Sequence, residues 1–213
     1  MALTLYLHPL SSYCHKALIA LYENAIAFTP EVVNLGDPAS RDNFKKVWPM
    51  AKFPVLRDDS RNQVIPESTS IIEYLDRHYP GPVKLLPNDD DDLAAQVRAT
   101  DRFYDLHVHN NMQQIVADKL RPADGHDPIG LKEAKERLGI ALGIAEEQMA
   151  TRKWACGDVF SMADCAAGPP LFFINKMMPL SKHLENYLER LTQRPSYARA
   201  LREAEPFMQY FPG

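Results

Sequence analysis

The sequence contains little glycine and cysteine, and it lacks several features that would mark a definite class of protein. Its 213 residues include 9 glycines and 3 cysteines, and the formal net charge is −4. The cysteines Cys14, Cys156 and Cys165 are too few and too scattered for a disulfide framework. The sequence has no excess of basic residues, so it gives no reason to expect nucleic acid or an anionic membrane as a partner. There is also no glycine-rich phosphate loop and no cluster of metal ligands, so we expect neither a nucleotide nor a metal.

Long apolar runs are absent as well. No run approaches the ~20 residues that a membrane-spanning helix needs. The first residues, MALTLYLHPL, lack the charged start and the cleavage site of a signal peptide. The composition, 46% apolar and 24% charged, is that of an ordinary globular protein. We therefore expect a cytoplasmic protein without a membrane partner.

The first 80 residues alternate between strand and helix patterns. Residues Leu3–His8 alternate apolar and polar side chains and predict a strand, and apolar residues recur at helical spacing over Ser12–Asn24. A second strand, a short helix, two short strands and a helix are then predicted, at Phe28–Val33, Asp37–Val47, Pro54–Leu56, around Val64 and at Glu67–Tyr79. The strand–helix–strand start predicts a parallel pair with a right-handed crossover, and the closing hairpin adds antiparallel strands. We expect a mixed four-stranded sheet with helices on its faces.

The rest of the chain predicts helices. Pro80, Gly81, Pro82 and Pro87 punctuate a segment without periodicity, so we predict a first domain at 1–80, a linker at 81–89 and an all-helical domain at 90–213. Four aspartates at 89–92 begin a long helix, where its dipole favours negative charge. Further helices are predicted around Leu138–Met149 and at Ser161–Met177, Leu184–Leu191 and Ser196–Glu203. Gly139 and Gly143 are expected to permit close helix packing.

The segment Ser11-Ser12-Tyr13-Cys14-His15-Lys16 lies where the first strand gives way to the first helix. A hydroxyl there sits beside free backbone N–H groups and the positive end of the helix dipole. Such a place stabilises an anion, including a thiolate. The alternative is that Ser11 or Ser12 merely caps the helix.

Two further segments of this domain carry polar groups at the start of an element. In Pro49–Leu56, a cis Phe53–Pro54 bond would turn the backbone groups of Phe53 outward, but few X–Pro bonds are cis and the sequence alone does not support that isomer. In Pro66–Ser70, proline, an acid and hydroxyls open a helix. The same groups offer N–H donors to a carboxylate and an acid to an ammonium, which together form the head of an amino acid.

These three segments, in this order, resemble the glutathione site of the cytosolic glutathione transferase superfamily. SSYCHKALIAL resembles the active-site segment of the serine-type zeta class and, more loosely, that of the theta class. PMAKFPVL resembles the loop and cis-proline strand, and PESTSIIEYLD resembles the Glu-Ser pair and its helix. A fourth segment, FSMAD at 160–164, resembles the buried capping box of the helical domain, with Ser161 and Asp164 as the reciprocal pair.

The resemblance implies a thioredoxin-like first domain that binds glutathione as co-substrate. Ser11 would donate its hydroxyl to the glutathione sulfur and hold it as thiolate, with Ser12 as the runner-up. The remaining glutathione-binding residues would be Ser12, Lys52, Phe53, Pro54, Glu67 and Ser68. Of these, Glu67 and Ser68 would hold the γ-glutamyl head and the backbone of Phe53 the cysteinyl part. Tyr6 and Tyr13 are weaker rivals for the hydroxyl donor.

The second substrate would bind in a pocket formed by the helical domain, with Tyr104, His107, Asn111 and Phe172 as candidates. Cys14 is expected to pack under the first helix, following the buried habit of free cysteine. We expect Asp101 to be a solvated surface acid; the alternative, which the resemblance implies, is that it reaches across a dimer to the γ-glutamyl ammonium. His107 and His109 lie two residues apart and so on different helix faces, which argues against a metal pair.

The resemblance implies a homodimeric glutathione transferase that directs the thiolate onto a small electrophile, typically in detoxification. One alternative is a glutathione-dependent isomerase or dehalogenase, motivated by the zeta-type serine segment. A second is a non-catalytic binding module that keeps the fold. The sequence does not name the second substrate.

Overall fold

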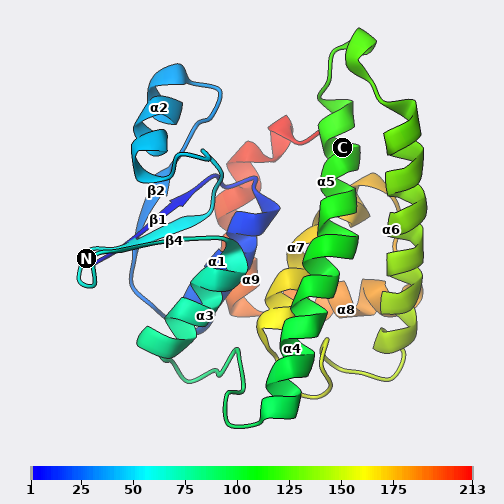
Figure 1. Ribbon diagram of the computed structural model, residues 1–213. Coiled ribbons are helices and arrows are strands. Elements are labelled where there is room, and N and C mark those ends of the chain that lie inside the picture. Colours follow the sequence, from blue (N-terminus) through cyan, green and yellow to red (C-terminus); the bar gives the residue numbers. More distant parts are fainter. Residues whose placement is uncertain (1, 213) are drawn as a thin grey trace. The chain divides into compact units, whose positions relative to one another are not determined.

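The computed structural model describes residues 2–212, which group into two compact units (Figure 1). The first unit runs from the start of the chain to Leu86 and also includes Arg194–Gln209. The second unit comprises Pro87–Gln193 and the residues from Tyr210 onward. Within residues 2–212, no helix is both long enough and apolar enough to cross a membrane.

The first unit contains a mixed sheet of four strands. The strands are β1 (Leu3–Leu7), β2 (Thr29–Val32), β3 (Val55–Asp58) and β4 (Gln63–Pro66), in the spatial order β2-β1-β3-β4. Strand β1 pairs in parallel with β2 and antiparallel with β3, and β3 pairs antiparallel with β4. The predicted parallel pair followed by a hairpin is confirmed.

Helices cover the sheet as the element order predicts. They are α1 (Ser12–Glu23), α2 (Pro38–Val47) and α3 (Ser68–His78). A core cluster of Tyr6, Val33, Phe44 and Val55 lies between α2 and the sheet, with the rings of Tyr6 and Phe44 stacked at 5.6 Å. Helix α1 packs against α3.

The end of the chain also belongs to the first unit. Helix α9 (Pro195–Ala204) packs on α1, and Figure 1 shows it in red behind that helix. Arg194 pairs with Glu23, the Ser196 hydroxyl donates to Glu23 at 2.6 Å, and Tyr22 donates to Glu203 at 2.5 Å. The domain boundaries 1–80 and 90–213 stay a prediction. Residues 194–209 group with the first unit, and the helical pattern of the sequence did not indicate this.

The second unit is helical. Helix α4 (Asp91–Phe103) continues through a π-helical turn, η1 (Tyr104–His109), into α5 (Asn110–Lys119). The others are α6 (Pro128–Met149), α7 (Met162–Met177) and α8 (Lys182–Thr192), with a short 3-10 turn at Ala123–Gly125. Asp90 caps α4 by accepting from the Leu93 N–H at 3.0 Å. Gly139 and Gly143 are exposed, and a Cβ at either would meet nothing within 4 Å, so the close packing expected there is wrong.

The predicted capping box is confirmed and is buried. Asp164, at 0% exposure, accepts from the Ser161 N–H at 2.8 Å and from the Ser161 hydroxyl at 3.1 Å. Its other oxygen accepts from the Ala155 N–H at 2.8 Å and from the Tyr187 hydroxyl at 2.6 Å. Four donors converge on one carboxylate, which fixes the start of α7 to the preceding loop and to α8.

Candidate functional site

Ser11 lies at the turn between β1 and α1. Its N–H donates to the His8 carbonyl at 2.9 Å, and its hydroxyl oxygen accepts from the Cys14 N–H at 3.3 Å, so Ser11 is the N-cap of α1. Ser11 is half-buried, whereas Ser12 is 1% exposed. Ser11 therefore has the capping role that the sequence analysis gave as the alternative to a functional one. This role does not exclude function, because the hydroxyl still has a proton to donate beside the positive end of the helix.

Cys14 is completely buried, as the sequence predicts for a free cysteine. Burial raises the pKa of its thiol to about 12, against smaller lowering contributions from the Ser11 hydroxyl and the His8 backbone. The thiol therefore stays protonated at neutral pH, and a reactive thiolate at this position is not favoured.

Phe53 and Pro54 lie in the loop before β3. The Phe53–Pro54 peptide bond is cis, the isomer that the sequence alone did not support. Phe53 is half-buried and packs against the cluster under α2, and Lys52 beside it is exposed. Pro54 is buried at the start of the strand. The loop is therefore anchored by the ring of Phe53, while the cation of Lys52 stays in solvent.

Glu67 and Ser68 begin α3. Glu67 has φ 69° and ψ 125°, its side chain is exposed, and it makes no side-chain cap. A non-glycine residue with positive φ is uncommon, and such strain clusters at ligand sites because surrounding structure must hold it in place. Ser68 is 4% exposed. The exposed Glu67 carboxylate therefore does not serve as the side-chain cap of α3.

A buried lysine ties the two helix starts together. Lys16 on α1 is 0% exposed, and its ammonium donates to the Thr69 hydroxyl on α3 at 2.7 Å. Thr69 directly follows Ser68. The turn at Ser11 and the turn at Glu67 are thus connected through one side-chain contact between α1 and α3.

His8, which the sequence analysis did not single out, lies in the same region. Its ring stacks on Phe53 at 6.0 Å and 21°, and the ring of Phe207 meets it edge-on at 5.6 Å and 73°. Its Nδ1 accepts from the Leu10 N–H at 3.2 Å. Partial burial lowers its pKa, which favours the neutral ring. The available signal was its position, at the end of the first strand and three residues before Ser11.

The four residues predicted for the second substrate lie in the helical unit. Tyr104 is fully buried, and burial raises its pKa; Asn111 is 4% exposed and donates to the His107 carbonyl at 2.6 Å. His107 is exposed and Phe172 half-buried, with the Lys176 ammonium 5.3 Å from the Phe172 ring. Their role in a pocket stays a prediction.

Asp101 corrects one expectation. It is 0% exposed rather than a solvated surface acid. Ala94, Val97, Asp101 and Tyr104 recur at three- and four-residue steps and share the buried face of the helix. The helical spacing therefore contained the signal. His107 is exposed and His109 buried, which confirms that these two histidines lie on different faces.

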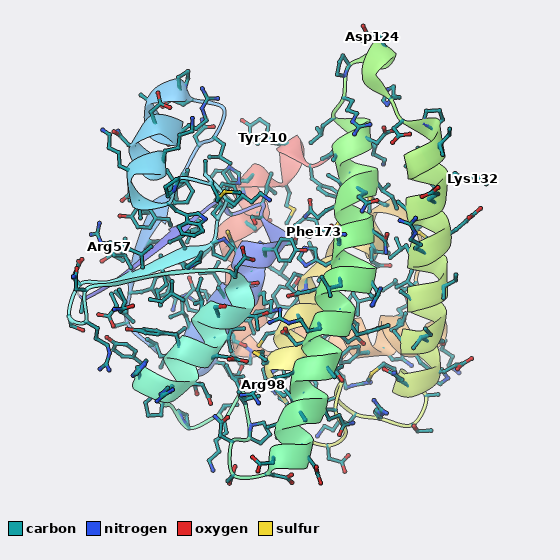
Figure 2. The ribbon with its side chains drawn as sticks, viewed as in Figure 1. Arg57, Arg98, Asp124, Lys132, Phe173 and Tyr210 are labelled. Atoms are coloured by element: carbon teal, nitrogen blue, oxygen red, sulfur yellow. The ribbon has the colours of Figure 1, made fainter. Side chains whose placement is uncertain are left out.

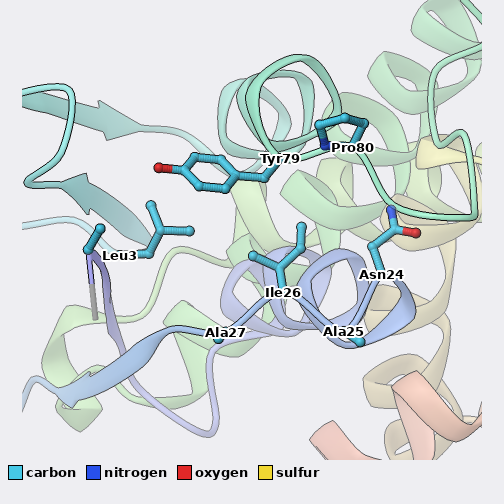
Figure 3. Close-up of a pocket in the computed structure, with 8 residues that line it drawn as sticks. Leu3, Asn24, Ala25, Ile26, Ala27, Tyr79 and Pro80 are labelled. Carbon is cyan, nitrogen blue, oxygen red and sulfur yellow. The ribbon is translucent and has the colours of Figure 1, made fainter.

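Two other regions of the first unit carry polar groups but no comparable site. A hollow of about 410 Å³ is lined by Leu3, Ile26, Tyr79 and neighbouring residues (Figure 3). Its polar groups are engaged elsewhere, because Tyr79 donates to Asp58 at 2.5 Å and Asn24 bonds both backbone groups of Val83. Tyr6 lies within β1, and its hydroxyl accepts from Arg57, labelled in Figure 2, at 2.7 Å.

Among residues 2–212, no group of three or more His, Cys, Asp or Glu side chains could hold a metal ion.

Comparison with known protein families agrees with this fold. Residues 5–83 match the model of the glutathione S-transferase N-terminal domain, and residues 111–195 match that of the C-terminal domain. The chain belongs to the glutathione S-transferase family.

Individual relatives within this family differ in name. The chain is 32% identical to glutathione S-transferase Z2 of Arabidopsis thaliana, over 96% of the chain and 92% of the relative. It is 27% identical to a probable maleylacetoacetate isomerase of Vibrio cholerae, with 97% and 98% coverage. It is 24% identical to a stringent starvation protein A homolog of Histophilus somni, with 96% and 92% coverage.

A solved structure shares the fold. The glutathione S-transferase of Methylobacillus flagellatus, solved with glutathione bound, superposes with a TM-score of 0.82 at 23% identity, covering 93% of this chain and 98% of that one.

Proposed function

We propose that this protein is a glutathione transferase that binds glutathione in the first unit and holds its sulfur as thiolate through Ser11. The observation that carries the proposal is the Ser11 hydroxyl, half-exposed at the N-terminus of α1, while Ser12 and Cys14 are buried. A hydrogen bond to the charged form and a helix N-terminus both lower a thiol pKa. Thiolate stabilisation and fixed approach to an electrophilic carbon are the two catalytic effects required.

The rest of the tripeptide is assigned to the neighbouring turns. Glu67 would pair with the γ-glutamyl ammonium and Ser68 with the adjacent carboxylate, since the strained backbone at Glu67 leaves that side chain free of a cap role. The backbone of Phe53, before Pro54, would pair with the cysteinyl part, and Lys52 would reach the glycyl carboxylate. The structure of the Methylobacillus relative with glutathione bound supports binding of this ligand by the family.

Replacing Ser11 tests the proposal. Ser11→Ala should reduce conjugation of a model electrophile by about one to three orders of magnitude, the scale for losing one donor to a developing anion. Glutathione affinity by calorimetry should change much less, because most contacts lie at Glu67, Ser68 and Phe53. Ser12→Ala is the matched comparison. If it lowers the rate and Ser11→Ala does not, the role belongs to Ser12.

An isomerase is the second candidate. The chain's likeness to a probable maleylacetoacetate isomerase and its zeta-type serine segment favour a reaction in which glutathione adds and is then released. Assaying cis–trans isomerisation of a maleyl-type diketo acid with catalytic glutathione distinguishes this from net conjugation.

A non-catalytic binding module is the third, and the likeness to a stringent starvation protein A homolog motivates it. The presence of both Ser11 and the Glu67–Ser68 pair favours an enzyme. Failure to bind glutathione in calorimetry would support the binding module instead.

We also propose a cytoplasmic homodimer that acts in detoxification of small electrophiles, as is usual for the family it belongs to. Light scattering at micromolar concentration would test the dimer, and the expected mass is twice the monomer mass of 24.2 kDa.

A further inference from the structure

The ring of His8 is held in a defined place beside Ser11. The His8 carbonyl accepts from the Ser11 N–H, so the two residues share one tight turn. Phe53, from the loop before β3, and Phe207, from the segment after α9, contact the ring from two sides. All four residues belong to the first unit. The imidazole is therefore packed against two aromatic rings and hydrogen-bonded within the turn that leads to Ser11.

The hydrogen bonding of His8 fixes its tautomer. Since Nδ1 accepts from the Leu10 N–H, it carries no proton, and in the neutral ring the proton lies on Nε2. Within residues 2–212, Nε2 makes no hydrogen bond, and the residue is half-exposed. An N–H donor is thus available on a residue that shares a turn with Ser11, and it has no partner among the described residues.

We propose that His8 donates its Nε2–H to the carbonyl oxygen of an α,β-unsaturated ketone or aldehyde while the glutathione thiolate attacks the β-carbon. This inference rests on the proposed function and specifies the class of electrophile. A donor near the sulfur is useful where negative charge develops on an atom close to the attacked carbon. Conjugated carbonyl compounds meet that condition, because attack at the β-carbon moves charge to the oxygen.

The electrons balance without a further reactant. The sulfur lone pair forms the S–C bond at the β-carbon. The C=C π pair forms a new double bond between the α-carbon and the carbonyl carbon, and the C=O π pair moves onto the oxygen, which becomes an enolate oxyanion. His8 hydrogen-bonds that oxyanion and keeps its proton. Water then delivers a proton to the α-carbon, which gives the saturated thioether.

Two electrophiles that share a phenyl group separate stabilisation of the oxyanion by His8 from general effects on the thiolate. 4-Phenyl-3-buten-2-one places charge on oxygen, whereas benzyl chloride releases chloride and has no oxygen. The measured quantity is the ratio of kcat/KM for the enone to kcat/KM for the chloride. His8→Asn keeps an acceptor for the Leu10 N–H but removes the Nε2 donor, so the ratio should fall about a hundredfold.

Further variants distinguish the donor from the shape of the ring. His8→Gln places an amide N–H near the former Nε2 and should recover part of the ratio. His8→Phe keeps the ring contacts without either nitrogen and should behave like His8→Asn, which covers the case in which the asparagine variant folds poorly. His183→Asn, outside the first unit, should keep the parent's ratio.

The outcomes separate this inference from the proposed function. If the parent binds glutathione and conjugates both compounds, but His8→Asn and His8→Phe keep the parent's ratio, the role of His8 is refuted and the transferase proposal stands. If the parent binds no glutathione in calorimetry, both are refuted.

Discussion

His15 offers the most direct test of the packing beneath the proposed site. It is 0% exposed, its Nε2 lies 2.6 Å from the Pro9 carbonyl oxygen, and its ring meets Tyr197 of α9 edge-on at 6.1 Å. Because a carbonyl only accepts, Nε2 carries the proton and donates. Burial lowers the pKa of His15 to about 4, against a smaller raising effect of the Pro9 carbonyl and of Glu203. The folded protein therefore holds this ring neutral.

The sign of the pH dependence follows from linkage. Between pH 6.5 and about 4 the unfolded chain binds a proton at His15 that the folded protein does not. Stability from the neutral ring is fully present above pH 6.5 and is lost as the pH falls through this window. Each pKa unit corresponds to about 1.4 kcal/mol, so the free energy of unfolding should fall by about 3 kcal/mol on account of this one residue.

Urea denaturation at pH 7.5, 5.5 and 4.5 measures the effect. His15→Gln keeps an N–H for the Pro9 carbonyl and removes the titration, so it should be less stable than the parent at pH 7.5 but lose less on acidification. Parallel losses in the parent and in His15→Gln would refute the assignment. The slope with urea should be the same in both proteins, which confirms that the same transition is compared.

Three further outcomes are expected. Asp164→Ala leaves the Tyr187 hydroxyl and the Ala155 and Ser161 N–H groups without their acceptor, so at least about 3 kcal/mol of stability should be lost by thermal melting, with near-normal activity per folded molecule. A variant that melts like the parent would contradict this. Gly139→Ala adds a methyl group that meets nothing, and should raise the free energy of unfolding by about 1 kcal/mol. Glu67→Gln should weaken glutathione binding about tenfold to a hundredfold, and glutathione lacking its α-amino group should lose little further affinity in that variant; additive losses would place the ammonium elsewhere.

Local patterns determined most of the elements that the sequence could predict. In β1 only Thr4 is not buried, and in α1 every residue from Cys14 to Leu21 is buried, so these two elements are covered on more than one face. The helical spacing in α3 arises from burial of one face, with Ile71, Ile72 and Leu75 buried, and this signal is present in the residues themselves. The capping box at Ser161 and Asp164 was readable for the same reason, since its reciprocal bonds join residues three apart.

Features that depend on distant contacts were not readable. The cis Phe53–Pro54 bond and the positive φ of Glu67 are conformations with low intrinsic frequency, and only the surrounding tertiary structure selects them. The ring contact between His8 and Phe207 joins residues that are about 200 positions apart in the chain. The π-helical turn at Tyr104–His109 likewise has no local sequence signal that we identified.

The grouping of Arg194–Gln209 with the first unit has a consequence for biosynthesis. Glu23 and Tyr22 of α1 acquire their partners from α9 only after residues 87–193 have been synthesised. Loop-closure entropy grows slowly with length, so this long connection costs the finished protein little, but the contact itself cannot form early. A nascent chain that ends at Leu86 leaves the α9-facing side of α1 uncovered. The first unit is therefore completed only after the second has been synthesised, and loss of residues 194–209 would remove the packing partners of α1.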